Sequence, residues 1–451
     1  MKILLVSNYF PPTHNAGTEK RTLGYALQLK KLGFDPQVVC AGNWDVGSKY
    51  WNGTDDQLYM DIPVRRVNLN WKLYPDPNKY LYQNPIIADH FAHWLDEWQP
   101  DLVHVTSCYT LTASVIQKVK DRNLPLVLTL TDYWFICPKH TLLKSNNSLC
   151  NGLTSNFECQ DCMLDGNENY RQFKRYFPLG LTIKSLEFIS KYPVISKNRG
   201  MRGMLLDMGE RKKFLSKIIN IPDEVIAPSQ YLADVYNAGG VSRNIRVIKS
   251  GHDLSWLKDA NGNEPADGIR LGYIGQILPT KGLHILVSAF ALNKQNWDTK
   301  LLVYGDHNKD TRYTAKLTNL IMDSENEILL RGSFPHEQLG EVLSGIDMLV
   351  VPSLWHENNP RVIQEAFASG TPVIASDVGG ISEFVRHDVN GLLFERGNES
   401  ALSNQISRVL EEPHLITKLR SGIEPVKKIE TEVEEIVKIY QGLIRSQFQL
   451  N

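Results

Sequence analysis

The residues from 348 to 378 constrain the fold more than any other part of this chain. Met348–Val351 is a short apolar run of the kind found in strands that are buried on both faces. A predicted helix follows, with Pro360 in its first turn, because a proline there loses no hydrogen bond. Pro372–Ala375 is the next predicted strand. A strand, a helix and a second strand in this order form the crossover of a parallel sheet, so we expect an α/β fold.

Two glutamates lie beyond the carboxyl end of the first of these strands, which is where parallel sheets bind their ligands. Glu357 precedes the helix, for which Asn358 or Asn359 is the expected N-cap, and the free N–H groups of a helix start favour phosphate. Glu365 lies in the second turn, where a carboxylate can accept two hydrogen bonds from a vicinal diol such as a ribose. The pattern indicates a pocket for a sugar nucleotide, although two solvated surface glutamates would give the same local sequence.

Length and alternation predict two domains. A chain of 451 residues is too long for one core and fits two domains of about 200 residues each. Short apolar runs alternate with helical segments in two sets, separated by the polar stretch Ala260–Gly268, which is typical of two doubly wound parallel sheets. The remaining predicted strands are Ile3–Val6, Pro36–Cys40, Leu102–Val105 and Leu126–Leu130 in the first set, and Ile269–Ile274, Leu301–Tyr304 and Ile328–Leu330 in the second.

Three stretches of the chain carry a family resemblance. Val350–Glu383 contains the E-x7-E spacing and ends in the sequence GGISE, and it closely resembles the signature of retaining glycosyltransferases of family 4. Leu271–Phe290 and the N-terminal residues 1–34 are similar to other parts of that family. The resemblance implies the GT-B fold, in which two Rossmann-like doubly wound domains face each other across a cleft. The expected boundaries are 1–264 for the acceptor-side domain, 265–430 for the nucleotide-sugar-binding domain, and 431–451 for a final helix that packs back on the first domain.

The activity that the resemblance implies is transfer of a sugar from a nucleotide-diphosphate-sugar donor to a glycan or lipid-linked acceptor, without a cofactor for catalysis. Such enzymes often act in cell-surface polysaccharide biosynthesis. Two other classes of function stay open. A GT-B epimerase or phosphorylase would use the same cleft, and a non-catalytic protein that binds nucleotide sugars would need only the donor pocket.

Lys281 is the expected partner of the donor diphosphate. A lysine at a helix start is electrostatically unfavourable unless an anion lies there, and a diphosphate gains negative charge as the glycosidic bond breaks. With Glu357 it forms the predicted catalytic pair. In the family a basic residue usually occupies the position of Gln276, so Arg361 is the expected substitute. The complete predicted donor-binding set is Gly17, Gly275, Gln276, Lys281, Ser333, Phe334, Glu357, Asn358, Asn359, Arg361, Val362 and Glu365.

The acceptor side departs from the family pattern after the strand that ends near Leu130. Relatives commonly place a histidine there that touches the donor sugar, whereas this chain has Thr131, which offers a hydroxyl but no second protonation state. Asp132 is a predicted sugar or acceptor contact. His104, at the end of the preceding strand, is the predicted substitute for the missing histidine. Gly17 would let the backbone approach the diphosphate or the acceptor.

Four of the six cysteines form a cluster in the sequence. Cys137, Cys150, Cys159 and Cys162 have the spacing C-x12-C-x8-C-x2-C, within a turn-rich insert, 137–162, that has few apolar residues. Four cysteines that end in C-x2-C favour a structural zinc site, with an iron–sulfur cluster, disulfides or free thiols as the alternatives.

Charge and hydropathy argue against nucleic-acid binding and a membrane-spanning helix, and one basic segment favours contact with a membrane surface. A net charge of −1 gives no case for nucleic acid, and no run of 18 apolar residues is present. We therefore expect a cytoplasmic protein. Tyr170–Lys217 carries twelve lysines and arginines against three acids, with apolar residues between them, so this segment is predicted to be helical and able to contact an anionic membrane from its inner face. A helical pair with a solvated basic face is the alternative.

Overall fold

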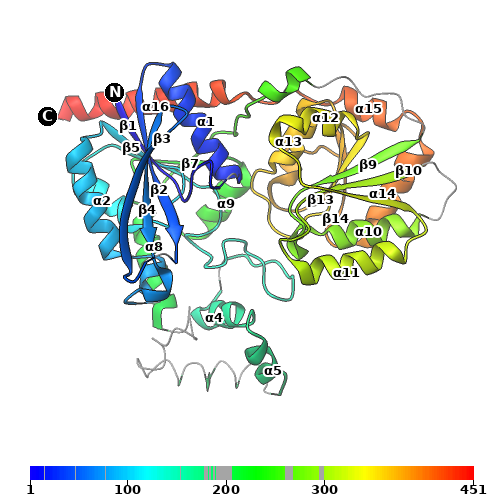
Figure 1. The fold of residues 1–451 in the computed structure, drawn as a ribbon, viewed down its shortest axis with the longest axis horizontal. Helices are drawn as coiled ribbons and strands as arrows, with labels where there is room; N and C mark the ends of the chain where they lie inside the picture. The colour runs from blue at the N-terminus through cyan, green and yellow to red at the C-terminus, as the bar shows by residue number, and fades with distance from the viewer. Residues whose placement is uncertain are drawn as a thin grey trace. The chain divides into compact units, whose positions relative to one another are not determined.

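Two largely parallel sheets organise the chain, one in each of two units of the computed structural model (Figure 1). The first unit joins Met1–Lys249 to Ile429–Asn451, and the second is Ser250–Lys428. The structure describes residues 1–14, 16–45, 47–76, 78–152, 154–176, 181, 184–185, 188, 206–259, 268–293 and 299–450. Within these residues, no helix is both long enough and apolar enough to cross a membrane.

The first sheet has the strand order β3-β4-β2-β1-β5-β6-β7-β8. Only β3 and β4 pair antiparallel among its strands, and the other neighbours are parallel. The strands β2 to β4 lie on one side of β1, and β5 to β8 lie on the other. The connections that follow β1 and β5 therefore lead away from each other. The strands are β1 (Lys2–Val6), β2 (Asp35–Trp44), β3 (Trp51–Tyr59), β4 (Ile62–Leu69), β5 (Leu102–Val105), β6 (Leu126–Thr129), β7 (Glu224–Ala227) and β8 (Ile245–Val247).

Among the residues that the structure describes, the α-helices of the first unit are α1 (Gly17–Lys31), α2 (Pro85–Trp98), α3 (Ser114–Lys120), α4 (Asn156–Leu164), α5 (Glu168–Tyr176), α8 (Leu206–Ile218), α9 (Gln230–Ala238) and α16 (Ile429–Leu450). The C-terminal helix α16 lies beside α1, although nearly the whole chain separates them (Figure 1). Buried Arg21 on α1 forms an ion pair with Glu432 on α16, and Tyr25 donates a hydrogen bond of 2.6 Å to the same carboxylate. These polar contacts and a shared apolar cluster hold α16 against α1 and the first sheet.

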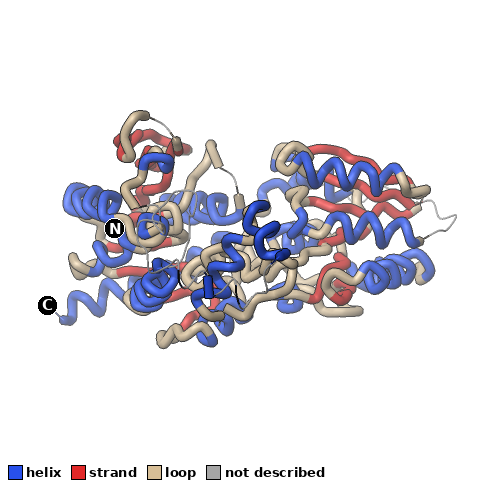
Figure 2. Tube along the Cα trace, turned by 90° about the horizontal axis from the view of Figure 1, so that it is seen from below, coloured by secondary structure: helices blue, strands red, loops and turns tan. Residues whose placement is uncertain are grey.

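The second sheet is entirely parallel, with the order β11-β10-β9-β12-β13-β14 and helices flanking its strands (Figure 2). Its strands are β9 (Ile269–Ile274), β10 (Thr299–Tyr304), β11 (Glu327–Gly332), β12 (Met348–Val351), β13 (Val373–Asp377) and β14 (Gly391–Glu395). Its helices are α10 (Leu283–Leu292), α11 (Thr311–Met322), α12 (Leu339–Ser344), α13 (Arg361–Ala368), α14 (Glu399–Glu411) and α15 (Leu415–Ser421). The order reverses between β9 and β12, which makes this the switch point of the sheet.

The first unit ends at Lys249 rather than at the predicted residue 264. The reason is that the residues directly after Lys249 already pair within the second unit. His252 forms a parallel bridge with Lys428, and its N–H donates to the carbonyl of Lys427 at 2.9 Å. Of the predicted linker, residues 260–267 lie outside the described residues. The same holds for most of 177–205, in the middle of the predicted basic segment, which α5 and α8 flank.

Candidate functional site

The predicted donor-binding residues of the second unit follow the carboxyl ends of its parallel strands. Gly275, Gln276 and Lys281 come after β9, Ser333 and Phe334 after β11, and Glu357 through Glu365 after β12. Because all these strands run in one direction, their following loops share one edge of the sheet. The loops after β9 and β12 meet at the switch point, where open parallel sheets bind ligands.

Lys281 and Glu357 meet there, with Nζ and Oε1 2.6 Å apart. The same Oε1 accepts a hydrogen bond from the Ser353 hydroxyl at 3.0 Å and from the Trp355 indole at 2.6 Å. Glu357 is only 8% exposed, so this carboxylate is held by protein donors rather than by water. In the described part of the chain, all its side-chain donors converge on Oε1, which leaves Oε2 able to accept from a ligand.

Two glycines let the backbone loops come this close. Gly282, directly after Lys281, has φ of +73°, and a Cβ there would lie 1.8 Å from the carbonyl oxygen of Pro352. Gly379 has φ of +62°, and its Cβ would lie 2.6 Å from the carbonyl oxygen of Glu357. Any other residue would push the loops apart, so these glycines set the position of the Lys281–Glu357 pair.

Glu365 and Arg361 lie on α13, one turn apart, with Oε1 and Nη2 separated by 3.7 Å. The N-cap of this helix is Pro360, so the expected asparagine cap is wrong. Asn359 instead accepts a hydrogen bond from the side chain of Gln364, which uses the oxygen that a cap would offer. Asn358 is buried, and Val362 is partly buried.

The other predicted donor contacts lie around the β9–β11 edge. The Gly275 N–H donates to the carbonyl of Tyr304 at 3.0 Å, and the Gln276 carbonyl accepts from the Tyr273 hydroxyl at 2.8 Å. Gln276 and Ser333 are exposed. The ring of Phe334 packs edge-on against Tyr304, with centroids 5.5 Å apart. The arrangement offers hydroxyl, amide and aromatic groups at one strand edge, and Gln276 supplies no positive charge.

In the first unit, Asp132 and Thr131 follow β6. One Asp132 oxygen accepts from the N–H of Trp134 at 2.7 Å, and the other lies 4.0 Å from Nδ1 of His140. Burial raises the pKa of Asp132, opposed by nearby His140, and burial lowers the pKa of His140. No sequence pattern singles out His140, whose contact with Asp132 depends on the turn between them. Thr131 is partly buried, and Gly17 is the exposed first residue of α1.

Glu19 is a buried acid of the first unit that motif reasoning missed. It lies in the first turn of α1, where an acid is expected merely to complement the helix dipole. The structure leaves it only 6% exposed, and burial raises its pKa. Its Oε2 has no hydrogen-bond partner among the described residues, and its charge helps to raise the pKa of Tyr9 and Tyr109.

His104 cannot contact a sugar, so its predicted role is wrong. The side chain is fully buried, with Nδ1 2.6 Å from the Tyr440 hydroxyl and Nε2 2.7 Å from the Thr129 hydroxyl. Burial lowers its pKa to about 3, which keeps the ring neutral. The imidazole therefore joins α16 to the first sheet and belongs to the core.

All four cysteines of the insert line one cavity of about 30 Å³, and none forms a disulfide. Across the described ranges, no three His, Cys, Asp or Glu side chains are gathered closely enough to hold a metal ion. Burial raises the pKa of Cys137, and backbone N–H groups that donate to its sulfur oppose this shift.

Comparison with known proteins matches both units to one class. Residues 255–424 match the family profile of glycosyl transferases group 1, and residues 16–154 match that of the glycosyl transferase 4-like domain. The sucrose-phosphate synthase of Thermosynechococcus elongatus superposes with a TM-score of 0.67 at 20% identity, covering 99% of both chains. Anabaena HepE, solved in complex with UDP and glucose, gives 0.64 at 18% identity over 98% of this chain and 100% of its own. These likenesses define a GT-B fold.

The chain belongs to the glycosyl transferases group 1 family, with a 4-like domain in its first unit. The lipopolysaccharide 1,2-N-acetylglucosaminetransferase of Salmonella typhimurium is 28% identical over 211 residues, 42% of this chain and 54% of that enzyme. The chain thus spans about half the length of the first curated relatives it matches, 45% and 54%.

Proposed function

We propose that this protein transfers a sugar, with retention of configuration, from a nucleotide-diphosphate-sugar donor to a glycan or lipid-linked acceptor. The observation that carries the proposal is the Lys281–Glu357 pair at the switch point, because it sets a cation for the diphosphate beside a carboxylate for the sugar. Family membership supports glycosyl transfer as the reaction. The complex of HepE with UDP and glucose supports a UDP-sugar as the first donor to test.

In the proposed step, the bond between the sugar C1 and the diphosphate oxygen breaks, and its electron pair leaves with that oxygen. The acceptor oxygen bonds to C1 on the same face, and its proton passes to the departing phosphate. Lys281 stabilises the charge that grows on the diphosphate. Glu357 accepts a hydrogen bond from a sugar hydroxyl through Oε2, and Glu365 accepts hydrogen bonds from the ribose hydroxyls. No metal takes part.

The second phosphate contact is assigned to Arg361, because Gln276 is neutral. Arg361 lies at the first position of α13, where the free N–H groups also favour phosphate. Its 3.7 Å separation from Glu365 is long for an ion pair, so the guanidinium can turn to an anion without breaking a short hydrogen bond. The remaining predicted donor contacts are Gly17, Gly275, Ser333, Phe334, Asn358, Asn359 and Val362.

The acceptor is proposed to bind the first unit near Thr131, Asp132 and Glu19. A buried carboxyl group, Glu19, and a partly buried one, Asp132, both with raised pKa values, suit the recognition of sugar hydroxyls, which both donate and accept hydrogen bonds. The Salmonella relative is named for lipopolysaccharide, which supports cell-surface polysaccharide assembly as the pathway.

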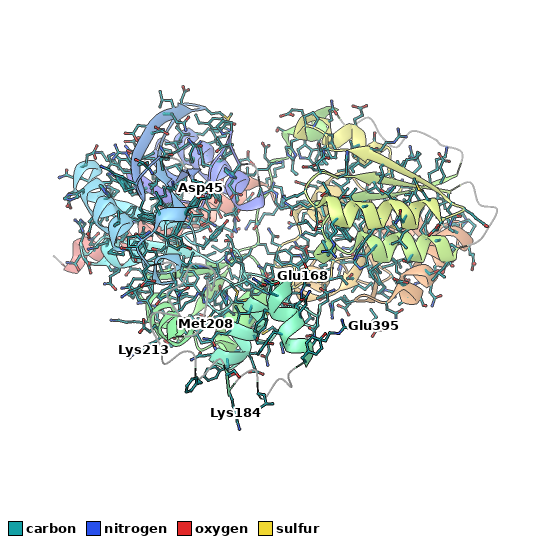
Figure 3. All side chains as sticks on the ribbon, turned by 60° about the horizontal axis from the view of Figure 1, so that its bottom comes forward. Asp45, Glu168, Lys184, Met208, Lys213 and Glu395 are labelled. Atoms are coloured by element: carbon teal, nitrogen blue, oxygen red, sulfur yellow. The ribbon has the colours of Figure 1, made fainter. Side chains whose placement is uncertain are left out.

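A peripheral contact with an anionic membrane is proposed for α5. Phe173 and Tyr176 are 43% and 81% exposed on this short helix, which also carries Arg171, Lys174 and Arg175. Lys184, farther along, points away from the fold (Figure 3). Apolar side chains among cations suit an anionic lipid surface. Sedimentation with phosphatidylglycerol vesicles at low salt should carry the protein down, whereas phosphatidylcholine vesicles should not; equal recovery with both lipids would contradict the proposal.

The testing experiment screens UDP-, GDP- and ADP-sugars for a rise in melting temperature and then measures nucleotide release with glycan acceptors. We expect one nucleotide class to stabilise the protein and to be turned over. Glu357→Gln should abolish turnover, while the matched Glu327→Gln, in an exposed pair with Lys300, should not change it. Turnover that survives Glu357→Gln would overturn the assignment.

The same experiment separates the alternatives. Neutral Gln276 favours a protein that binds nucleotide sugars without turning them over, because one phosphate contact is missing. Stabilisation by a donor without release of nucleotide, across a broad acceptor panel, would support that binding protein. Conversion of the donor into a second nucleotide sugar, detected by NMR, would identify an epimerase.

A further inference from the structure

The four cysteines of the insert come from three pieces of backbone. Cys137 lies in the turn after Tyr133, and Cys150 ends a short hairpin closed by the Leu143–Leu149 bridge. Cys159 and Cys162 lie on α4, three residues apart and therefore on one face of the helix. Residues that are separate in sequence thus bring all four sulfurs to the wall of a single small cavity.

The sulfurs receive hydrogen bonds of the kind that stabilise thiolates. The Gly152 N–H donates to the sulfur of Cys150 at 3.4 Å, and the Thr154 hydroxyl lies 3.0 Å from that of Cys159. A polar partner beside a sulfur suits a metal-bound thiolate, whose sulfur commonly accepts hydrogen bonds from surrounding groups.

A buried cation lies close to two of these cysteines and has no short ion pair with a carboxylate in the described part of the chain. Arg211, on α8, is 6% exposed and donates to the carbonyl of Trp134, over whose ring it also lies. Among the described residues no carboxylate oxygen lies within 4.0 Å of its guanidinium, whose charge acts on the Asp132 carboxyl as well as on Cys137 and Cys159. A buried charge is costly unless it is paired, and metal-bound thiolates would pair it.

We propose that Cys137, Cys150, Cys159 and Cys162 bind one zinc ion and that Arg211 balances part of its thiolate charge. Four S–H groups lose their protons to water and four Zn–S bonds form, giving a complex of charge −2 without electron transfer. The sulfurs line the cavity without forming a closed set, so binding is expected to draw α4 toward the Cys137 turn. Zinc is favoured over an iron–sulfur cluster because four cysteines that end in C-x2-C are typical of structural zinc sites.

The metal would order a segment that has little core of its own. Its effect reaches the acceptor side through the chain, because Cys137 is bonded through its carbonyl to the N–H of His140, which neighbours Asp132. The zinc site does not depend on the proposed reaction: the ion can be present in a protein that transfers no sugar.

The test measures zinc, iron and acid-labile sulfide in protein purified without chelators, and then replaces the metal with Co²⁺ under reducing conditions. We expect about one zinc per chain and, with cobalt, the sulfur charge-transfer and visible bands of a tetrahedral thiolate site. The variant Cys159→Ser/Cys162→Ser should lose both signals. The matched variant Cys40→Ala/Cys108→Ala removes the two cysteines outside the cavity and should keep them.

Several outcomes would overturn the zinc site. These are stoichiometric iron with sulfide, zinc that persists in Cys159→Ser/Cys162→Ser, or wild-type protein with reduced thiols that shows no cobalt bands. The cobalt spectrum is taken on wild-type protein, so it remains decisive if the double variant fails to fold.

The charge-balancing role of Arg211 has its own readout. Arg211→Met should weaken zinc binding about tenfold in competition with a chelator, whereas Arg211→Lys should keep most of the affinity because it keeps the charge. Arg246→Met, which removes an exposed arginine paired with Glu224, is the control and should change nothing. Unchanged zinc affinity in Arg211→Met would refute the role of Arg211.

Discussion

Replacing Lys281 by methionine should have two separable effects, one on stability and one on donor binding. The side chain forms a 2.6 Å hydrogen bond with largely buried Glu357. Hydrogen bonds to charged groups contribute about 1.5–3 kcal/mol, and because Ser353 and Trp355 still donate to the carboxylate, we expect a loss of about 1–2 kcal/mol. For a unit of this size that corresponds to a fall in melting temperature of roughly 3–6 °C.

Donor binding should fall further, because the donor diphosphate loses its cation. The loss of one such contact should raise the Kd for the stabilising nucleotide sugar about 10–100-fold, measured by titration calorimetry. The control is Lys300→Met, whose exposed pair with Glu327 should matter little to stability and nothing to the donor. If Lys281→Met lowers the melting temperature but leaves the Kd within about twofold of wild type, Lys281 only neutralises Glu357 and the phosphate role is refuted.

Three further variants test other parts of the structure. Glu365→Gln should weaken UDP and UDP-sugar by the same factor, about tenfold in calorimetry, because both carry the ribose; unequal losses would contradict the assignment. His104 has a pKa lowered to about 3, so the unfolded chain binds a proton that the folded one does not, and stability falls as the pH drops below the ordinary value of 6.5. Between pH 7.5 and 5.5, wild type should lose about 1.4 kcal/mol more than His104→Gln in urea unfolding; equal slopes would speak against a neutral buried ring. Glu432→Gln leaves the buried Arg21 guanidinium without its charge partner and should cost about 3–5 kcal/mol, and a loss below about 1 kcal/mol would mean that the pair is solvated.

Strands that are buried on both faces were predicted best from the sequence. Leu102–Val105, Ile269–Ile274 and Met348–Val351 have the predicted bounds, because continuous apolar runs have a single explanation in a parallel sheet. The hairpin formed by β3 and β4 escaped prediction, because no residue of β3 is fully buried and the strand is largely polar, including two adjacent aspartates. An edge strand of this kind lacks the apolar signal on which the other strands were identified.

The candidate site was predictable as a set of residues but not as a geometry. Glu357 and Lys281 could each be singled out from a motif, yet their contact joins residues that lie 76 positions apart and depends on the strand order. His104 was misassigned for the same reason: its partner Tyr440 is 336 positions away, on a helix that returns to the first sheet. Local patterns identify helix starts and strand ends, whereas burial by a distant element decides whether a polar side chain faces a ligand or the core.

Hydrogen–deuterium exchange with and without the stabilising nucleotide sugar tests the central claim most directly, because it reports where the donor binds without relying on any substitution. The account predicts slower exchange in the three loops of the second unit at residues 275–283, 352–361 and 379–383. Slower exchange confined to other regions, with these three loops unchanged at saturating donor, would contradict the assignment of the donor site to the switch point of the second sheet.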